Sequence, residues 1–211
     1  RAAFPEIAVR VTVHAPPKDA EARLEAAASE VRARIGTHCY GEGDTTMEQV
    51  VGRLLTEQGK TLALAESCTG GLIGHRITNV SGSSAYFLAD LVTYSNAAKE
   101  SLLGVNPSTL AAHGAVSVEV AAEMATGVRR VTGATLGLAS TGIAGPEGGT
   151  PEKPVGTVCL GLATPERVFA QRYQLWGTRE WVKILTAQVA LEWVRRVWLG
   201  FDPTVSVARR R

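Results

Sequence analysis

The sequence predicts an α/β protein in which helices cover both faces of a layered sheet. Strand-like apolar runs alternate with segments of helical periodicity along most of the chain. The run at residues 61–65, TLALA, is continuously apolar, as in a strand that is buried on both faces. With 211 residues, of which 45% are hydrophobic and 20% charged, the chain has enough apolar material for a sizeable core. This composition excludes a disordered or fibrous protein.

Residues 1–45 are predicted to form a small separate unit. Valines alternate with polar residues at 7–13, which predicts a strand with one apolar face. Apolar residues at helical spacing predict a helix over 18–35, and a short strand follows at 38–40. The result is a β-α-β piece, which residues 41–45, GEGDT, link to the rest of the chain.

Residues 46–211 are predicted to form one larger domain. A capping box opens its first helix, because Thr45 precedes Glu48 by three residues. Further helices are predicted at residues 72–77, 96–103, 118–131 and 179–198. Besides 61–65, strands are predicted at residues 87–94, 135–140, 155–162 and 168–174. A short turn joins the last two, which predicts one antiparallel hairpin in an otherwise mostly parallel sheet.

Charge does not favour nucleic acid as a partner. The 22 basic and 20 acidic residues give a formal net charge of +2, and three of the positive charges are Arg209, Arg210 and Arg211. Without this tail the balance would be slightly negative, so a basic surface for nucleic acid is not expected. Because the chain begins with Arg1 rather than Met, we expect it to be a processed product or a fragment.

Other sequence features also narrow the classes of function. There is no apolar run long enough to span a membrane, and no signal-peptide order of residues at the start. The three cysteines show no CxxC spacing, which favours a reducing cytoplasm. The four histidines show no metal-binding spacing, so we expect no metal and no other cofactor.

Glycine marks the expected site. Fifteen of the 22 glycines lie between positions 70 and 161, where they cluster with serine and threonine near the ends of predicted strands. Ligands of open α/β sheets bind beyond the carboxyl ends of strands, and glycine lets backbone N–H groups approach an anion there. Three segments are of this kind: ESCTGG at 66–71, SGSS at 81–84 and STGIAGP at 140–146.

Ser67 and Lys99 are the candidate catalytic pair. Ser67 lies at a predicted strand-to-helix turn, whose free N–H groups can hold a phosphate or a developing oxyanion. A serine nucleophile needs a base. If Ser95 caps the next helix, Lys99 lies in its first turn, where the helix dipole lowers the lysine pKa. The alternatives are a simple capped turn at Ser67 and a solvated surface lysine at Lys99.

Other assignments stay open at this point. Cys68 is a rival nucleophile or a buried packing residue. His75 and His113 are rival bases, although the sequence places no carboxylate to orient them. The long loop after residue 142 is a lid or a mobile connector, and Arg179 is a phosphate ligand or the partner of a surface acid.

Three long segments match a known family in sequence and order. They are TLALAESCTGGLIGHRITNVSGSSAYFLADLVTYSNAAKESLLGV, GAVSVEVAAEMATGVRR and ASTGIAGPEGGTPEKPVGTV. They resemble the CinA C-terminal domain, the nicotinamide mononucleotide deamidase (PncC) family, from about Met47 to Leu191. Residues 1–41 resemble the KH-type middle domain of full-length CinA proteins. The resemblance implies that a further N-terminal domain, similar to molybdopterin-biosynthesis proteins, is missing from this chain.

The resemblance also implies a fold and a reaction. The fold is a three-layer α/β/α sandwich with a mostly parallel, mixed five-stranded sheet, preceded by a small α+β, KH-like domain. The reaction converts nicotinamide mononucleotide and water to nicotinic acid mononucleotide and ammonia, with Ser67 and Lys99 as a Ser–Lys dyad. We expect Tyr94 to orient this dyad. We expect substrate contacts from Glu66, Cys68, Thr69, Gly70, Gly71, Ser83, Ser140, Thr141, Gly142 and Arg179.

Two other functions remain as alternatives. A non-catalytic nucleotide-binding regulator of a competence or DNA-damage response would bind the mononucleotide without releasing ammonia. Nucleic-acid binding is not expected, because residues 1–41 contain no GxxG loop. We expect a small-molecule substrate, a homodimer, no membrane contact and a cytoplasmic location.

Overall fold

The computed structural model describes residues 2–205, and contacts divide the chain into two units between Thr46 and Met47. Arg1 and the arginine tail, Arg209 to Arg211, lie outside the described residues. Each unit is described by itself below.

The larger unit is built on a five-stranded sheet of order β4-β3-β5-β6-β7. Its strands are β3 (Leu62–Glu66), β4 (Phe87–Val92), β5 (Leu136–Gly142), β6 (Thr157–Ala163) and β7 (Val168–Gln174). β3 pairs in parallel with β4 and β5, whereas β6 is antiparallel to both β5 and β7. The mixed sheet and the β6–β7 hairpin confirm the prediction. The antiparallel β5–β6 pair was not predicted, and it explains why no crossover helix separates these strands.

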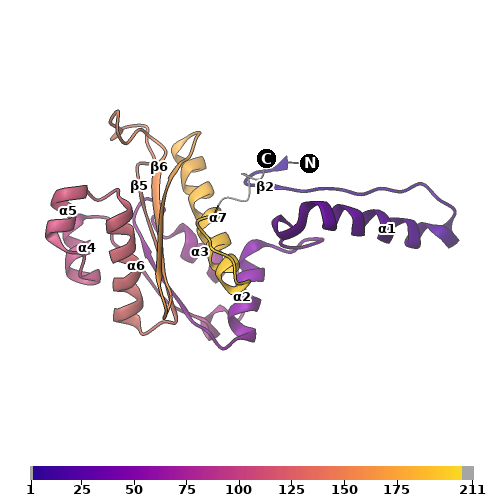
Figure 1. Ribbon diagram of the computed structural model, residues 1–211, viewed down its shortest axis with the longest axis horizontal. Coiled ribbons are helices and arrows are strands. Elements are labelled where there is room, and N and C mark those ends of the chain that lie inside the picture. Colours follow the sequence, from indigo (N-terminus) through magenta and orange to yellow (C-terminus); the bar gives the residue numbers. More distant parts are fainter. Residues whose placement is uncertain (1, 206–211) are drawn as a thin grey trace. The chain divides into compact units, whose positions relative to one another are not determined.

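Helices cover both faces of this sheet and complete three layers (Figure 1). On one face lie α4 (Asn96–Leu103), α5 (Pro107–His113) and α6 (Val118–Thr132), with α6 packed on β3, β5 and β6. On the other lie α2 (Met47–Glu57), α3 (Leu72–Thr78) and α7 (Arg179–Trp198), with α7 packed on β5 and β6. The predicted three-layer α/β fold is confirmed.

Helix α6 packs closely against the buried strands of the sheet. Strands β3 and β6 are buried along their whole length, as expected for strands covered on both faces. Glycine allows α6 to approach the sheet closely: a Cβ at Gly137 would overlap Ala125 O, and one at Gly161 would overlap Ala121 O. The backbone of α6 therefore packs directly on β5 and β6.

Most predicted elements of this unit have the expected bounds. Helix α4 begins behind Ser95, whose hydroxyl accepts a hydrogen bond from Ala98 N, and it ends at Gly104 in the left-handed region. Helix α2 begins at Met47, one residue later than a cap at Thr45 would place it. Helix α5 was missed, because its seven residues bury only Leu110 and show no apolar period.

The smaller unit differs from its prediction. Residues 7–13 and 38–40 are not strands: β2 covers only Glu6–Ile7 and pairs with β1 (Ala2–Ala3), and Gly36–His38 is the 3₁₀ turn η1. Val9 is 58% exposed, so the alternating valines do not cover a sheet. The predicted β-α-β piece is therefore wrong. The predicted helix is present as α1 (Pro17–Ile35), with Gly36 as its C-cap.

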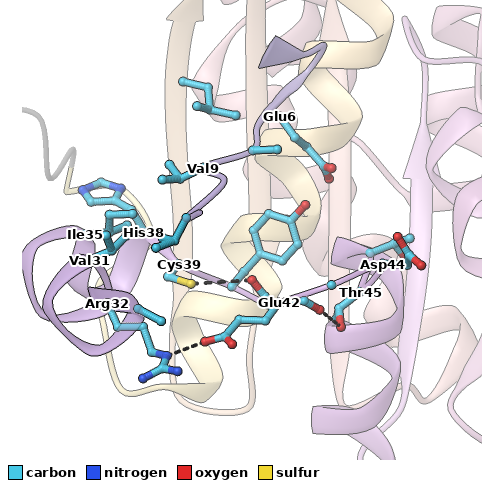
Figure 2. A pocket seen from close by; sticks show the side chains of 18 residues that line it. Glu6, Val9, Val31, Arg32, Ile35, His38, Cys39, Glu42, Asp44 and Thr45 are labelled. Atoms are coloured by element: carbon cyan, nitrogen blue, oxygen red, sulfur yellow. Dashed lines mark hydrogen bonds and ion pairs between the residues drawn. The ribbon is translucent and has the colours of Figure 1, made fainter. Parts of the chain in front are cut away.

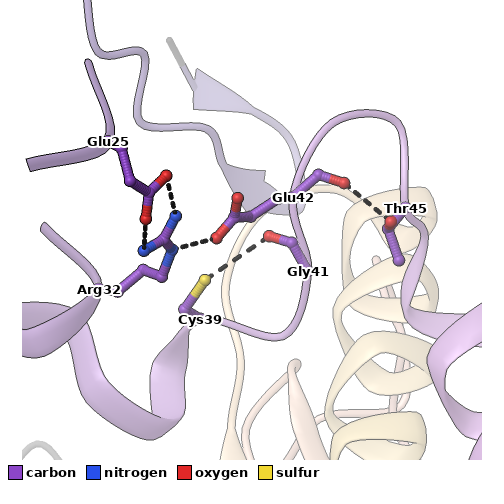
Figure 3. A network of polar contacts seen from close by, with 6 residues as sticks. All are labelled: Glu25, Arg32, Cys39, Gly41, Glu42 and Thr45. Atoms are coloured by element: carbon purple, nitrogen blue, oxygen red, sulfur yellow. Dashed lines mark hydrogen bonds and ion pairs between the residues drawn. The ribbon is translucent and has the colours of Figure 1, made fainter. Parts of the chain in front are cut away.

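A cavity of about 530 Å³ lies within this unit (Figure 2). Helix α1 lines it with Ala28, Val31 and Ile35, although no residue of α1 is buried. Arg32 donates hydrogen bonds to both Glu25 and Glu42 (Figure 3), which ties the helix to the linker. These ion pairs are exposed and stabilise little.

Neither a membrane-spanning helix nor a cluster of metal ligands is present in the described residues. Among residues 2–205, no helix is long and apolar enough to cross a bilayer. Within the same range, no three His, Cys, Asp or Glu side chains are grouped as metal ligands.

Candidate active site

The carboxyl ends of β3, β4 and β5 meet at one edge of the sheet. Ser67 follows β3, Tyr94 lies between β4 and α4, and Thr141 and Gly142 end β5. A cavity of about 210 Å³ opens there. Its lining consists of Ser67, Cys68, Tyr94, Asn96, Lys99, Ala115, Val116, Thr141, Gly142, Ala144 and Arg179.

Lys99 reaches Ser67 inside this cavity. Its Nζ lies 3.1 Å from Ser67 Oγ, and it donates to Thr93 O at 2.8 Å and to Tyr94 O at 3.4 Å. The Ser95 cap starts α4 so that Lys99 falls in the first turn, where only 1% of the residue is exposed. Burial lowers the pKa of Lys99. The site therefore favours a neutral amine that can take a proton from Ser67.

Buried hydroxyls support Ser67 from the neighbouring strand. Ser67 N donates to Ser140 O at 2.9 Å, and the hydroxyls of Ser140 and Thr69 lie 2.7 Å apart. Both side chains are completely buried and lie outside the cavity lining. Thr69 and Ser140 therefore hold the turn in place. Substrate contacts were expected from these two residues, and the structure does not place them in the cavity.

Glu66 points away from the cavity and caps α3. Its two carboxylate oxygens accept hydrogen bonds from Gly71 N and Gly74 N, both at 2.8 Å, and its side chain is fully buried. Gly70 and Gly71 have φ values of 62° and 90°, which turn the chain from β3 into α3. The Gly71 N–H is therefore already bonded within the protein, and the expected substrate contacts of Glu66, Gly70 and Gly71 are absent from the cavity lining.

Ser83 lies at the opposite end of the sheet. It begins the 3₁₀ turn η2 (Ser83–Ala85), which precedes β4. Tyr86 O, just after this turn, accepts a hydrogen bond from Leu62 N at the start of β3. The SGSS segment therefore lies at the amino ends of strands, away from the edge where α/β sheets bind ligands. The structure therefore does not bring Ser83 to the cavity that holds Ser67 and Lys99.

Arg179 joins α7 to the rim of the cavity. Its Nη1 donates to Gly145 O at 2.9 Å, and its Nη2 donates to Tyr94 Oη at 3.0 Å. Opposite this rim, Thr141 Oγ1 donates to Ala115 O at 2.8 Å. Besides the Lys99 amine, the lining contains one basic residue, Arg179, and no acidic one. Such a lining suits a substrate that carries an anionic group.

The alternative catalytic groups are either protonated near neutral pH or lie outside the cavity lining. Cys68 lines the cavity, but burial raises the pKa of its thiol to about 12, so the thiol stays protonated near neutral pH. His75 is exposed on α3, and neither His75 nor His113 belongs to the lining.

The loop of residues 143–156 is tied to the protein on two sides. Lys153 Nζ donates to His113 O at 2.6 Å, and Arg172 Nη2 donates to Glu152 O at 2.6 Å. The loop also contributes Ala144 to the cavity. These hydrogen bonds hold the loop in place as one wall of the cavity. The sequence had allowed two interpretations of this loop, a lid or a mobile connector.

Four lining residues were not predicted: Asn96, Ala115, Val116 and Ala144. Asn96 lies next to the Ser95 cap, and its place at the start of the lysine-bearing helix was the signal that could have found it. Ala115 and Val116 precede α6, and their position depends on α5, which the sequence did not reveal.

Together these features define a class: a three-layer α/β protein with a buried serine–lysine pair at the carboxyl edge of a mixed sheet. Comparison with known families gives the particular one. The chain belongs to the CinA C-terminal domain family, whose model matches residues 44–198.

Relatives and solved structures agree with this membership. A CinA-like protein of Geobacter sulfurreducens is 50% identical over 194 residues, which are 92% of this chain and 47% of the relative. The CinA-like protein of Salinibacter ruber is 48% identical over 190 residues, 90% of this chain and 46% of the relative. The chain spans about half the length of the curated relatives it matches.

Solved structures share the fold of the larger unit. The competence/damage inducible protein CihA from Agrobacterium tumefaciens is 39% identical, with a TM-score of 0.67 over 72% of this chain and 95% of that one. A CinA superfamily protein from Klebsiella pneumoniae is 31% identical, with a TM-score of 0.70 over 74% of this chain and 100% of that one.

Proposed function

We propose that this chain is an amidohydrolase that converts nicotinamide mononucleotide and water to nicotinic acid mononucleotide and ammonia. The observation that supports it most is the buried Lys99 amine, 3.1 Å from Ser67 Oγ in a cavity. A serine beside a neutral amine is an activated nucleophile of the kind that attacks carboxamides. Membership of the CinA family, which includes such deamidases, supports the same substrate.

The reaction begins with proton transfer from Ser67 to Lys99. Ser67 Oγ attacks the carboxamide carbon and Lys99 becomes an ammonium. The amides of Ser67, Gly70 and Gly71 already donate within the protein. In the described part of the chain, the N–H group of Cys68, which lines the cavity, donates to no other residue, and we assign the oxyanion to it.

The second half of the reaction reverses these roles. Lys99 gives its proton to the departing nitrogen, and the C–N bond breaks. Ammonia departs, and the acyl group remains bound to Ser67 as an ester. Lys99 then takes a proton from water, which attacks the ester carbon. The C–O bond to Ser67 breaks as the proton returns to Ser67 Oγ, and the acid product leaves.

The size of the cavity supports an orientation for the substrate. At about 210 Å³ it is smaller than the roughly 300–1,000 Å³ of pockets that enclose whole ligands. We therefore expect the amide-bearing ring to enter the cavity while the ribose phosphate stays at the rim. Arg179 lies at that rim, where its guanidinium can bind the phosphate.

Ammonia release from nicotinamide mononucleotide tests the proposal. The purified chain is expected to form ammonia and nicotinic acid mononucleotide in equal amounts. Nicotinamide, which lacks the ribose phosphate, is expected to react far more slowly. Binding of the mononucleotide without ammonia release would instead support the non-catalytic regulator.

Broader features belong to the same proposal. We expect a cytoplasmic homodimer. The KH-like assignment of residues 1–45 rests on the resemblance alone and stays a prediction, because the short strands β1 and β2 differ from the predicted β-α-β order.

A further inference from the structure

We infer that Asp90 holds a proton for Glu66, that this shared proton keeps the Ser67 turn in place, and that its loss sets an alkaline limit on activity. Asp90 is a positioning residue in this account, because it acts through Glu66. Only the kinetic test of this inference rests on the proposed function.

Strand register brings the two carboxyl groups to one face of the sheet. Asp90 on β4 pairs with Leu64 on β3, and Glu66 lies two residues further along β3. Side chains two apart on a strand point to the same face, so Glu66 and Asp90 both face α3. A Cβ at Gly74 would overlap Asp90 Oδ2, and Gly74 N donates to Glu66 Oε1. Both carboxyl groups therefore converge on one residue of α3.

The hydrogen bonds indicate which carboxyl group holds the proton. Both oxygens of Glu66 accept N–H groups, so Glu66 acts as the carboxylate of the pair. Asp90 as a residue is partly exposed, but its Oδ1 is buried and has no partner among the described residues. An ionised oxygen that is buried without a donor is costly, whereas a protonated Asp90 can donate to Glu66. Burial, then the charge of Glu66, raises the pKa of Asp90 to about 8.

Other charges near this pair do not replace the proton. On α3 the titratable residues are His75, which is exposed, and Arg76; on α7, Lys183 places its ammonium group near Gly70. The guanidinium of Arg76 is already bonded to Glu48 and Gln188. In the part of the chain that the structure describes, Glu66 is the charged group that acts on Asp90.

Glu66 connects Asp90 to the residues of the proposed active site. It directly precedes Ser67, and its backbone O accepts a hydrogen bond from Thr93 N at 2.8 Å. Thr93 O in turn accepts one from Lys99 Nζ. When Asp90 releases its proton to solvent above about pH 8, a second negative charge appears against Glu66. We expect the bonds of Glu66 to Gly71 and Gly74 to weaken and Ser67 to lose its alignment.

An NMR titration of the whole chain tests the proton directly. Aspartate labelled with ¹³C at the side-chain carboxyl reports on four residues: Asp19, Asp44, Asp90 and Asp202. The Asp90 signal, assigned through its backbone resonances, is expected to titrate near pH 8. Titration near the ordinary value of about 4 overturns the inference, whether or not the protein is an enzyme.

The Asp90→Asn variant tests the consequence. Its amide can still donate to Glu66 but cannot ionise. At pH 7 we expect kcat within about twofold of the parent protein, and above pH 8 we expect the parent alone to lose activity reversibly. The Asp44→Asn control, at an exposed residue outside the larger unit, is expected to keep the alkaline loss.

The outcomes separate the two proposals. An alkaline loss that persists in Asp90→Asn overturns the role of Asp90. If no form of the protein releases ammonia, the proposed function fails, and the NMR titration still decides where the proton lies.

Discussion

At the scale of single residues, the proposed reaction depends on Lys99 as a buried amine that can become neutral. Burial lowers its pKa from the ordinary value of 10.5, so the neutral fraction increases as pH rises through that lowered pKa. We expect kcat/KM to rise with pH over the same range, because only the neutral amine accepts the Ser67 proton. The rate of ammonia release measured between pH 6 and pH 8, below the Asp90 limit, checks this.

Replacement of Lys99 separates its basicity from its charge. In Lys99→Arg the guanidinium stays protonated and cannot accept the Ser67 proton. We therefore expect kcat to fall by about 10²–10⁴-fold, as in Lys99→Ala. Steady-state kinetics on both variants measures this loss. Undiminished amide hydrolysis by either variant would contradict the Ser–Lys assignment.

Cys68 is a residue whose reactivity its surroundings suppress. Because burial raises the pKa of its thiol to about 12, the thiolate is scarce at neutral pH. We expect Cys68→Ala to keep kcat within about threefold of the parent protein and to lose about 1–2 kcal/mol of stability through the small cavity it leaves. Ammonia assays and urea unfolding measure both quantities. Loss of catalysis in a folded Cys68→Ala protein would make Cys68 the nucleophile.

At the scale of elements, the start of α4 determines where the base lies. Ser95 caps this helix, and loss of such a cap costs about 1 kcal/mol. We expect Ser95→Ala to lower kcat roughly tenfold as well, since Lys99 is in the first turn. The control is Asn106→Ala, which removes the N-cap of α5 outside the cavity lining. Equal effects of both variants on kcat would contradict this link.

At the start of α7, we expect Arg179 to bind the phosphate of the proposed substrate. Arg179→Ala is expected to raise KM for nicotinamide mononucleotide about 10–100-fold with a smaller effect on kcat. Arg172→Ala is the matched control, because Arg172 bonds to the same loop through Glu152 O but does not line the cavity. If KM is unchanged in Arg179→Ala, the phosphate lies elsewhere.

The same elements show how far sequence reasoning reaches. Local signals at Ser95, Gly104 and Thr178 mark helix ends, and α4 and α7 have the predicted bounds. The alternating valines of residues 7–13 satisfy a local pattern, but residues 2–205 contain no long partner strand that bonds to their backbone. Strand formation there depends on a distant partner that local pattern does not reveal.

The site was partly predictable for a similar reason. The serine and the lysine follow strands that end at the same edge, and the rule for α/β sheets places them together. Ser83 shares the same glycine-rich composition but precedes its strand, so it lies at the other end. Whether Glu66 faces a ligand or caps α3 depends on side-chain direction, which the sequence does not give.

At the scale of the whole molecule, the two units differ in what they supply. Every residue that lines the cavity with Ser67 and Lys99 belongs to the unit that begins at Met47, and α1 of the smaller unit buries none of its residues. We therefore expect a chain of residues 47–211 to fold and to release ammonia at the parent rate. Thermal unfolding and the ammonia assay check this. A folded fragment without activity would show that residues 1–46 contribute to catalysis.

The most direct test of the central claim compares Ser67→Ala and Cys68→Ala in one ammonia assay with nicotinamide mononucleotide. The account predicts that Ser67→Ala is at least about 10³-fold slower than the parent protein while Cys68→Ala retains its rate. Full activity of a folded Ser67→Ala protein would contradict the account, because no acyl intermediate could then form on Ser67.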